Sequence, residues 1–337
     1  MILHKKTVFL FLAAASLMIS GCGGDSKYYN EPESTGTRQT EHAAENPASP
    51  SNSIKVLEYT PAPGQYINDS ATGGMPADIT TPREAALWAE TRLEKRLFVS
   101  LGAFGGYITI GFEHEVINSL TDYDFAIFGN AFLGSGGSGG SNEPGIVYVM
   151  EDTNGNGLAD DVWYELRGSE TEAPSTLRDY SVTYQRPAEA GQPVEWTDNL
   201  GNTGTIDYLK AFHKQDYYYP AWIAEDSYTL SGTRLEARTE CDPETGMWST
   251  NAFGGGYADN MGSDNTAFDG MAQTNRFRIS DAIDASGAPV RLHGIHFVKV
   301  QTGVCSKAGH LGEISTEVLG FADLMTEPDD SGVPMIR

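Results

Sequence analysis

Short runs of apolar residues alternate with glycine-rich turns along most of the chain between Ile54 and residue 325. The apolar positions are mainly β-branched and aromatic, residue types that favour pleated strands with one buried face. Turn residues recur at regular intervals, and the chain contains 38 glycines. The pattern predicts an all-β protein with a β-sandwich fold and long Gly/Asn/Asp-rich loops. The predicted strands are Ile54–Tyr59, Leu97–Leu101, Tyr107–Phe112, Asp124–Phe128, Ile146–Met150, Val162–Leu166, Tyr180–Gln185, Tyr228–Leu230, Arg276–Ile279, Gly294–Val300 and Glu317–Leu319.

One segment, near residues 82–95, has helical periodicity instead. Thr81 is a natural N-cap, Pro82 suits the first helical position, and Glu84 completes a capping box. The apolar residues that follow at helical spacing are Ala86, Ala89, Leu93 and Leu97. The sequence therefore predicts one short helix in an otherwise β-rich chain.

The segment between the strands Ile146–Met150 and Val162–Leu166 resembles a calcium loop of the EF-hand type. Oxygen ligands at alternate positions, with a glycine at the sixth, allow a loop to wrap a hard cation. Trp163 occupies the twelfth position, where a bidentate acid is required, so Asp161 or Glu165 would complete the shell. An Asn-Gly-rich hairpin turn without an ion is the alternative. The predicted ligands are Asp152, Asn154, Asn156, the backbone carbonyl of Leu158, Asp160 and Asp161.

The start of the chain has the features of a secretory signal. Lys5 and Lys6 precede the apolar run Thr7–Met18, which is too short for a permanent membrane span. Cys22 directly follows Ser-Gly, a pattern that resembles the bacterial lipobox. Residues 1–21 are therefore predicted to be a lipoprotein signal peptide, and Cys22 the lipidated first residue of the mature chain. An ordinary signal peptide with an incidental cysteine is the alternative.

Composition divides the mature chain into three parts. Residues 22–53 are polar and cannot bury enough apolar surface to form a fold, so we expect a disordered tether after the lipidated cysteine. Residues 54–325 follow as the β-sandwich module, which by length alone could be one large domain or two small ones. Residues 326–337 form a polar tail.

The net charge limits the classes of binding partner, and the cysteine content limits the possible disulfides. Without residues 1–21 the chain has 20 basic and 46 acidic side chains, a formal net charge of −26. Such a surface repels nucleic acid and anionic head groups, and it suits calcium or a cationic or neutral ligand. Cys241 and Cys305 could form one disulfide outside the cytoplasm.

The segment Phe212–Trp222 is the most ligand-like part of the sequence, because aromatic residues alternate there with hydrogen-bonding ones. Aromatic faces provide large contact area for a sugar ring or a planar cofactor, and polar neighbours fix its orientation. The alternative is that these aromatics belong to the core. The predicted ligand-binding residues are Phe212, His213, Tyr217, Tyr218, Tyr219 and Trp222, with Trp196 and Trp248 as helpers.

Two further groups of polar residues are candidate sites. The loop 257–270 holds Asp259, Asn260, Asp264, Asn265 and Asp269, which could bind a second calcium ion or simply favour turns. For catalysis, the sequence has no HExxH motif and no paired-cysteine metal spacing. Glu113 and Glu115 would share a strand face and could act as a glycosidase pair, whereas His293 and His296 would point to opposite faces. An enzyme is not expected.

Several short sequence segments together resemble those of a family of bacterial cell-surface lipoproteins found widely in Bacteroidetes. The resemblance covers nearly all of residues 54–325 and implies a single jelly-roll-like β-sandwich at the cell surface. Similar lipoproteins accompany TonB-dependent outer-membrane transporters, including systems for cobalamin and related corrinoids. The segments are Val99–Gly106, Asp124–Phe132, Glu143–Val147, Asn154–Asp161, Asp226–Gly232 and Gly312–Val318.

These observations lead to two functional hypotheses. In the first, an outer-membrane lipoprotein without enzymatic activity captures a nutrient for a TonB-dependent transporter, and a structural calcium ion stiffens the ligand loops. The resemblance favours a corrinoid over a glycan as the nutrient. It does not identify which residues of this chain would contact the corrinoid. In the second, the chain is an adhesive or structural module that recognises a glycan or protein partner without capturing a small molecule.

Overall fold

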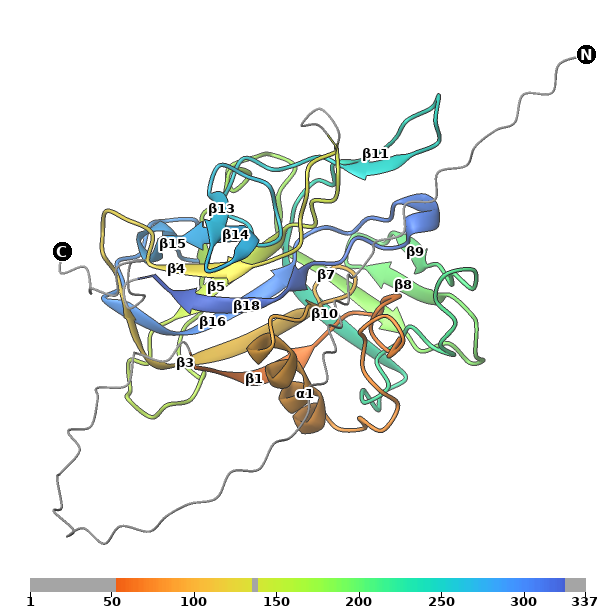
Figure 1. The fold of residues 1–337 in the computed structure, drawn as a ribbon, viewed down its shortest axis with the longest axis horizontal. Coiled ribbons are helices and arrows are strands. Elements are labelled where there is room, and N and C mark those ends of the chain that lie inside the picture. The colour runs from red at the N-terminus through yellow and green to blue at the C-terminus, as the bar shows by residue number, and fades with distance from the viewer. Residues whose placement is uncertain (1–52, 135–138, 325–337) are drawn as a thin grey trace, which may run out of the picture. The chain divides into compact units, whose positions relative to one another are not determined.

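The computed structural model describes residues 53–134 and 139–324. The predicted signal peptide, Cys22, the tether up to residue 52 and the polar tail lie outside these described residues. Within them the chain folds into antiparallel sheets with one α-helix, which confirms the all-β, sandwich-like fold class. Figure 1 shows the sheets and the helix.

Two sheets share the largest core. Alternate residues of β3 and β5, such as Ile108, Ile110 and Val147, point inward from the larger sheet. Phe125 and Ile127 of the smaller sheet belong to the same apolar cluster. The larger sheet has the strand order β1 (Ile54–Thr60), β3 (Tyr107–Ile117), β16 (Gly294–Thr302), β5 (Gly145–Met150), β6 (Tyr164–Leu166), β15 (Ala282–Ile283). The smaller sheet has the order β13 (Asn265–Phe268), β14 (Met271–Phe277), β4 (Phe125–Phe128), β18 (Gly320–Asp323).

A third sheet has its own core, to which Tyr180, Val182 and Tyr184 of β7 contribute. Its strand order is β10 (Ser227–Arg234), β7 (Leu177–Gln185), β8 (Val194–Asp198), β9 (Thr203–Ile206). Two short ribbons and two 3₁₀ turns complete the fold: β11 (Thr239–Cys241) with β12 (Trp248–Thr250), β17 (Glu317–Val318) with β2 (Val99–Ser100), η1 (Ile279–Asp281) and η2 (Gly309–Leu311).

Helix α1 (Pro82–Glu94) confirms the predicted helix and its capping box. The backbone N–H of Glu84 donates to Thr81 Oγ1 at 3.2 Å, and the Thr81 N–H donates to the Glu84 carboxylate at 3.0 Å. Its buried face, which includes Ala89 and Leu93, packs mainly on β1 (Figure 1). Because the helix ends at Glu94, the predicted apolar position Leu97 is 44% exposed.

Candidate ligand groove and buried carboxylate cluster

The outer face of the six-stranded sheet carries aromatic and polar side chains at neighbouring register positions. On β3 and β16, Tyr107 lies opposite Gln301 and Thr109 lies opposite Lys299. On the other side of β16, Tyr148 of β5 lies opposite Lys299. Because successive strand residues point to opposite faces, these side chains gather on the face away from the shared core.

A groove with a volume of about 730 Å³ lies over this face. One wall comes from the loop between β5 and β6, which contributes Gly157, Leu158 and Trp163 and runs beside β1 and β3 (Figure 1). A second hollow of about 480 Å³ adjoins it and shares Leu57 and Gly157. The volume lies within the roughly 300–1,000 Å³ typical of small-molecule sites.

Lys299 is the charged centre of the groove. Its Nζ lies 4.5 Å from the ring centroid of Tyr148, 5.3 Å from that of Trp163 and 5.7 Å from that of Tyr107. Burial lowers the pKa of Lys299, and the nearby Glu58 carboxylate acts in the opposite direction. The groove therefore presents ring faces around one cation, an arrangement that suits a ligand with both ring surface and polar groups.

The polar side chains at the groove floor are fixed by hydrogen bonds. Gln301 Nε2 donates to the carbonyl oxygens of Gly105 at 2.8 Å and Ser231 at 3.1 Å. The Tyr107 hydroxyl donates to Glu58, and burial, followed by this contact, raises the pKa of Tyr107. These contacts hold the side chains in place before a ligand arrives.

The predicted calcium loop closes on itself around Asp152. The Asp152 carboxylate accepts hydrogen bonds from the backbone N–H groups of Gly155 at 2.8 Å, Asn156 at 3.1 Å and Gly157 at 2.8 Å. These donors, Gly157 first, lower the pKa of Asp152. Gly157 has φ +74°, a left-handed conformation that glycine adopts without steric cost. The turn has the sharp bend that both a cation loop and an ion-free hairpin require.

The other predicted ligands of this loop lie near one another. The side-chain amides of Asn154 and Asn156 donate to Asp160 at 3.2 Å each, and Thr153 Oγ1 donates to Asp161. Glu165, the alternative ligand at the end of the loop, instead accepts a hydrogen bond from Thr233 Oγ1. Asp161 and the carbonyl of Leu158 belong to the same exposed loop, and the contacts of Asp161 are made within that loop. Calcium binding here stays a prediction.

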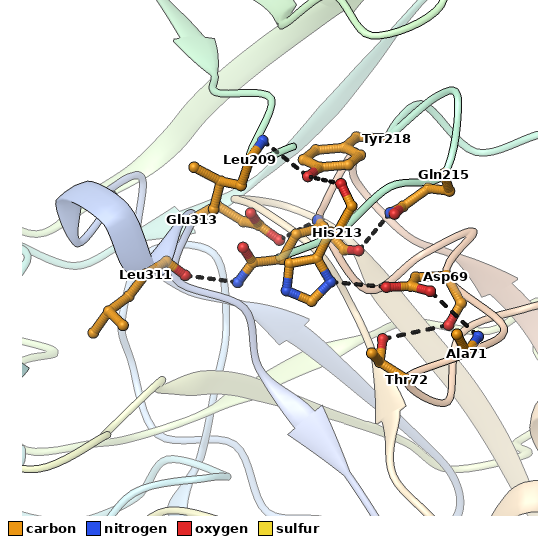
Figure 2. A network of polar contacts seen from close by, with 10 residues as sticks. Asp69, Ala71, Thr72, Leu209, His213, Gln215, Tyr218, Leu311 and Glu313 are labelled. Atoms are coloured by element: carbon orange, nitrogen blue, oxygen red, sulfur yellow. Dashed lines mark hydrogen bonds and ion pairs between the residues drawn. The ribbon is translucent and has the colours of Figure 1, made fainter. Parts of the chain in front are cut away.

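His213 of the predicted aromatic ligand segment lies in a buried polar network (Figure 2). Its Nδ1 lies 2.9 Å from Asp69 Oδ2, and both side chains are 9% exposed. Its backbone carbonyl accepts a hydrogen bond from the Tyr218 hydroxyl at 3.2 Å, and the same hydroxyl accepts one from the Leu209 N–H at 2.9 Å. His213 thus joins its own loop to the 65–72 segment.

Most of the remaining aromatics of this segment belong to the core. Tyr218, Tyr219 and Trp222 are 1%, 0% and 5% exposed, so a ligand cannot stack on their faces. Only Phe212, at 58%, and Tyr217, at 37%, are exposed. The predicted contact surface is corrected to these two residues, because Tyr218 and Tyr219 belong to the core of the third sheet and Trp222 belongs to the largest core. The predicted helpers Trp196 and Trp248 pack partly buried against two different core clusters.

Among the predicted catalytic candidates, Glu115 and His293 form a pair. Glu115 Oε1 lies 3.1 Å from His293 Nδ1 across β3 and β16. His296 is directed elsewhere, since its Nδ1 accepts a hydrogen bond from the Asp152 N–H at 3.3 Å. Glu113 is exposed and lines only the smaller hollow.

The predicted disulfide is wrong for this structure, because Cys241 and Cys305 are both free thiols. Cys241 is exposed on β11, whereas Cys305 is partly buried and packs against the core of the third sheet. Burial raises the pKa of the Cys305 thiol.

The acids of the 257–270 loop do not share one site. Asp269 forms an exposed ion pair with Arg96 at 2.8 Å, and Asp264 accepts a hydrogen bond from the Gly256 N–H at 3.2 Å. Asp259 is buried at 1% exposure and joins two acids from distant segments, Glu143 and Glu317. The predicted second calcium loop is therefore not a single site, and Asp259 groups instead with Glu143 and Glu317.

Glu143, Asp259 and Glu317 each place one carboxylate oxygen within 4.8 Å of those of the other two. Burial, and then the charge of Glu143, raises the pKa of Asp259 to about 8. Burial also raises the pKa values of Glu143 and Glu317. This cluster was not predicted from the sequence, because its members are far apart along the chain. The one indication in the sequence was that Glu143 and Glu317 lie in two of the segments on which the family resemblance rests.

No protein-family model matches the chain, and no curated protein matches it significantly. Among the described residues, no helix is long and apolar enough to cross a bilayer.

Proposed function

We propose that the protein is a non-enzymatic, lipid-anchored protein of the outer-membrane surface that captures a nutrient for a TonB-dependent transporter. The observation that carries the capture step is the groove over β1, β3 and β16, where ring faces and fixed polar groups converge. The anchor rests on the sequence around Cys22, and the transporter rests on the family resemblance. A tethered binder raises the concentration of its ligand at the transporter mouth.

The groove suits a large ligand with ring surface and polar substituents. Trp163 and Tyr107 offer ring faces, Lys299 and Glu58 offer charges of opposite sign, and Gln301 is held rigidly. The resemblance favours a corrinoid. A glycan is the second candidate, because aromatic rings beside hydrogen-bonding groups also suit sugar rings.

The Asp152 loop has a supporting role in this proposal. It provides the groove wall that contains Gly157 and Leu158, and Leu158 is 58% exposed. A calcium ion held by Asp152 and its neighbours would fix this wall and reduce the ordering cost of ligand binding. Removal of calcium is then expected to weaken ligand binding without abolishing the groove.

The test is calorimetric titration of the purified protein with cobalamin, with and without EDTA, followed by a glycan array. Trp163→Ala is expected to weaken binding at least tenfold, because truncation of a ring in a binding site removes most of its contact area. Phe212→Ala is the matched control, since Phe212 is an exposed aromatic outside the groove. Equal affinities for the wild type and Trp163→Ala would contradict the groove, and loss of binding in Phe212→Ala would move the site to the 212–222 segment.

A further inference from the structure

The carboxylate cluster of Glu143, Asp259 and Glu317 lies outside the groove and is not used by the proposed function. Three hydrogen bonds hold its segments together. The Glu143 N–H donates to the Asp259 carbonyl at 3.0 Å, and the Glu317 N–H donates to Asp259 Oδ2 at 2.9 Å. Thr316 Oγ1 donates to the Glu143 carbonyl at 2.7 Å. The three carboxylates are therefore brought together by the fold itself.

The positive charge needed to balance this cluster is not supplied by the described side chains. The ion pairs found among residues 53–134 and 139–324 involve none of its three acids. Asp259 Oδ1 accepts hydrogen bonds from the N–H groups of Asn130 at 2.9 Å and Ala131 at 2.8 Å, which stabilise one carboxylate. Three ionised carboxylates at this separation repel one another strongly in a buried site, so a proton or a cation must lie among them.

A separate observation points to a missing partner. Glu317 is 5% exposed, and its Oε1 accepts no hydrogen bond from the described residues. Glu313, at 4% exposure, also has an unpartnered oxygen, Oε2, and its pKa is raised by burial and then by the charge of Glu143. Buried acceptors without donors are rare in folded proteins, and an ion or a water is the usual explanation.

We propose that Glu143, Asp259 and Glu317 form a binding site for a divalent cation of the Ca²⁺ class. The donor set consists only of hard carboxylate oxygens, which Ca²⁺ accepts in flexible geometry and in larger number than Mg²⁺ does. The ion would join the segment before β5 to the 258–259 segment and to β17. It would stabilise the fold, and it is independent of any ligand in the groove.

The experiment measures Ca²⁺ binding to the purified protein after EDTA treatment, by calorimetry and by elemental analysis of the desalted protein. Glu317→Gln keeps the shape of the side chain and removes its charge. We expect it to lose one bound Ca²⁺ per chain or to bind that ion at least tenfold more weakly. Asp281→Asn is the matched control, because Asp281 is a carboxyl outside both calcium candidates whose pKa burial also raises. It is expected to bind Ca²⁺ as the wild type does.

A second variant keeps the test decisive if Glu317→Gln does not fold. Asp152→Asn disables the predicted exposed loop and leaves the cluster intact, so it is expected to retain one Ca²⁺ per chain. Absence of bound Ca²⁺ in Asp152→Asn would overturn the proposal. Identical Ca²⁺ affinity and stoichiometry in the wild type and Glu317→Gln would overturn it too and would leave a shared proton as the occupant of the cluster. Neither result depends on whether the protein binds cobalamin, so the cation site and the proposed ligand capture are tested separately.

Discussion

Glu165 shows how its surroundings decide the role of a single acidic residue. It stands at the end of the predicted calcium loop, yet its carboxylate accepts a hydrogen bond from Thr233 and not from the loop. Burial raises the pKa of Glu165, while the Thr233 hydroxyl and Arg178 act in the opposite direction. A side chain in this setting contributes to stability in a way that depends on pH.

The pH dependence has a defined sign. Because its pKa is raised in the folded state, Glu165 binds a proton more tightly there than in the unfolded chain, so its contribution is most favourable below its ordinary pKa of 4.5. That contribution falls as pH rises above 4.5. The stability of Glu165→Gln is therefore expected to rise relative to that of the wild type as pH increases from 4.5 to 7.5. Urea unfolding in EDTA at both pH values measures this, and a constant difference would contradict it.

Residue types alone could not assign the sites. The alternation in Phe212–Trp222 is equally compatible with a core and with a binding surface, and burial of Tyr218 and Tyr219 decided for the core. The cluster of Glu143, Asp259 and Glu317 depends on contacts between distant segments, which no local pattern encodes. The Asp152 turn was visible in the sequence because its contacts are local.

At the scale of elements, local physical signals predicted most of what is present. Helix α1 was located by its cap, and the long strands β1, β7 and β16 were found by their alternating apolar residues. The sequence pattern did not reveal the strands β8 and β9, or the short strands β11 to β13, β15 and β18. These strands have two to five residues each, too few to show a clear pattern, and pairing with neighbouring segments fixes them, as β9 pairs with β8.

The helix cap provides a direct test. Thr81→Ala removes the acceptor for the Glu84 N–H, and loss of such a cap typically costs about 1 kcal/mol. Thr91→Ala is the matched control in the same helix, because the Thr91 hydroxyl only donates to the Leu87 carbonyl at 3.0 Å and is exposed. We expect Thr91→Ala to change stability by less than about 0.5 kcal/mol. Urea unfolding midpoints measure both variants, and equal effects would show that the cap is not stabilising.

At the scale of the whole molecule, the proposed functions divide between separate parts of the chain. The groove lies on the outer face of one sheet, the carboxylate cluster ties three segments beside β5 and β17, and the predicted anchor is at Cys22. Ligand capture, cation binding and membrane attachment should therefore be separable by mutation, because sites without shared partners contribute independently.

Membrane attachment gives the clearest case. Lipid chains hold a protein at a bilayer through burial of their CH₂ groups, at about 0.8 kcal/mol each, and the acidic mature chain adds no electrostatic attraction. Cys22→Ser is therefore expected to abolish incorporation of labelled palmitate and to release the protein from the membrane fraction of a bacterial host. Cys241→Ser is the matched control, since it removes an exposed thiol elsewhere and should leave attachment unchanged. Undiminished labelling of Cys22→Ser would show that this cysteine is not the anchor. Release of the protein with unaltered ligand binding in the groove would show that membrane attachment and ligand capture are separate properties.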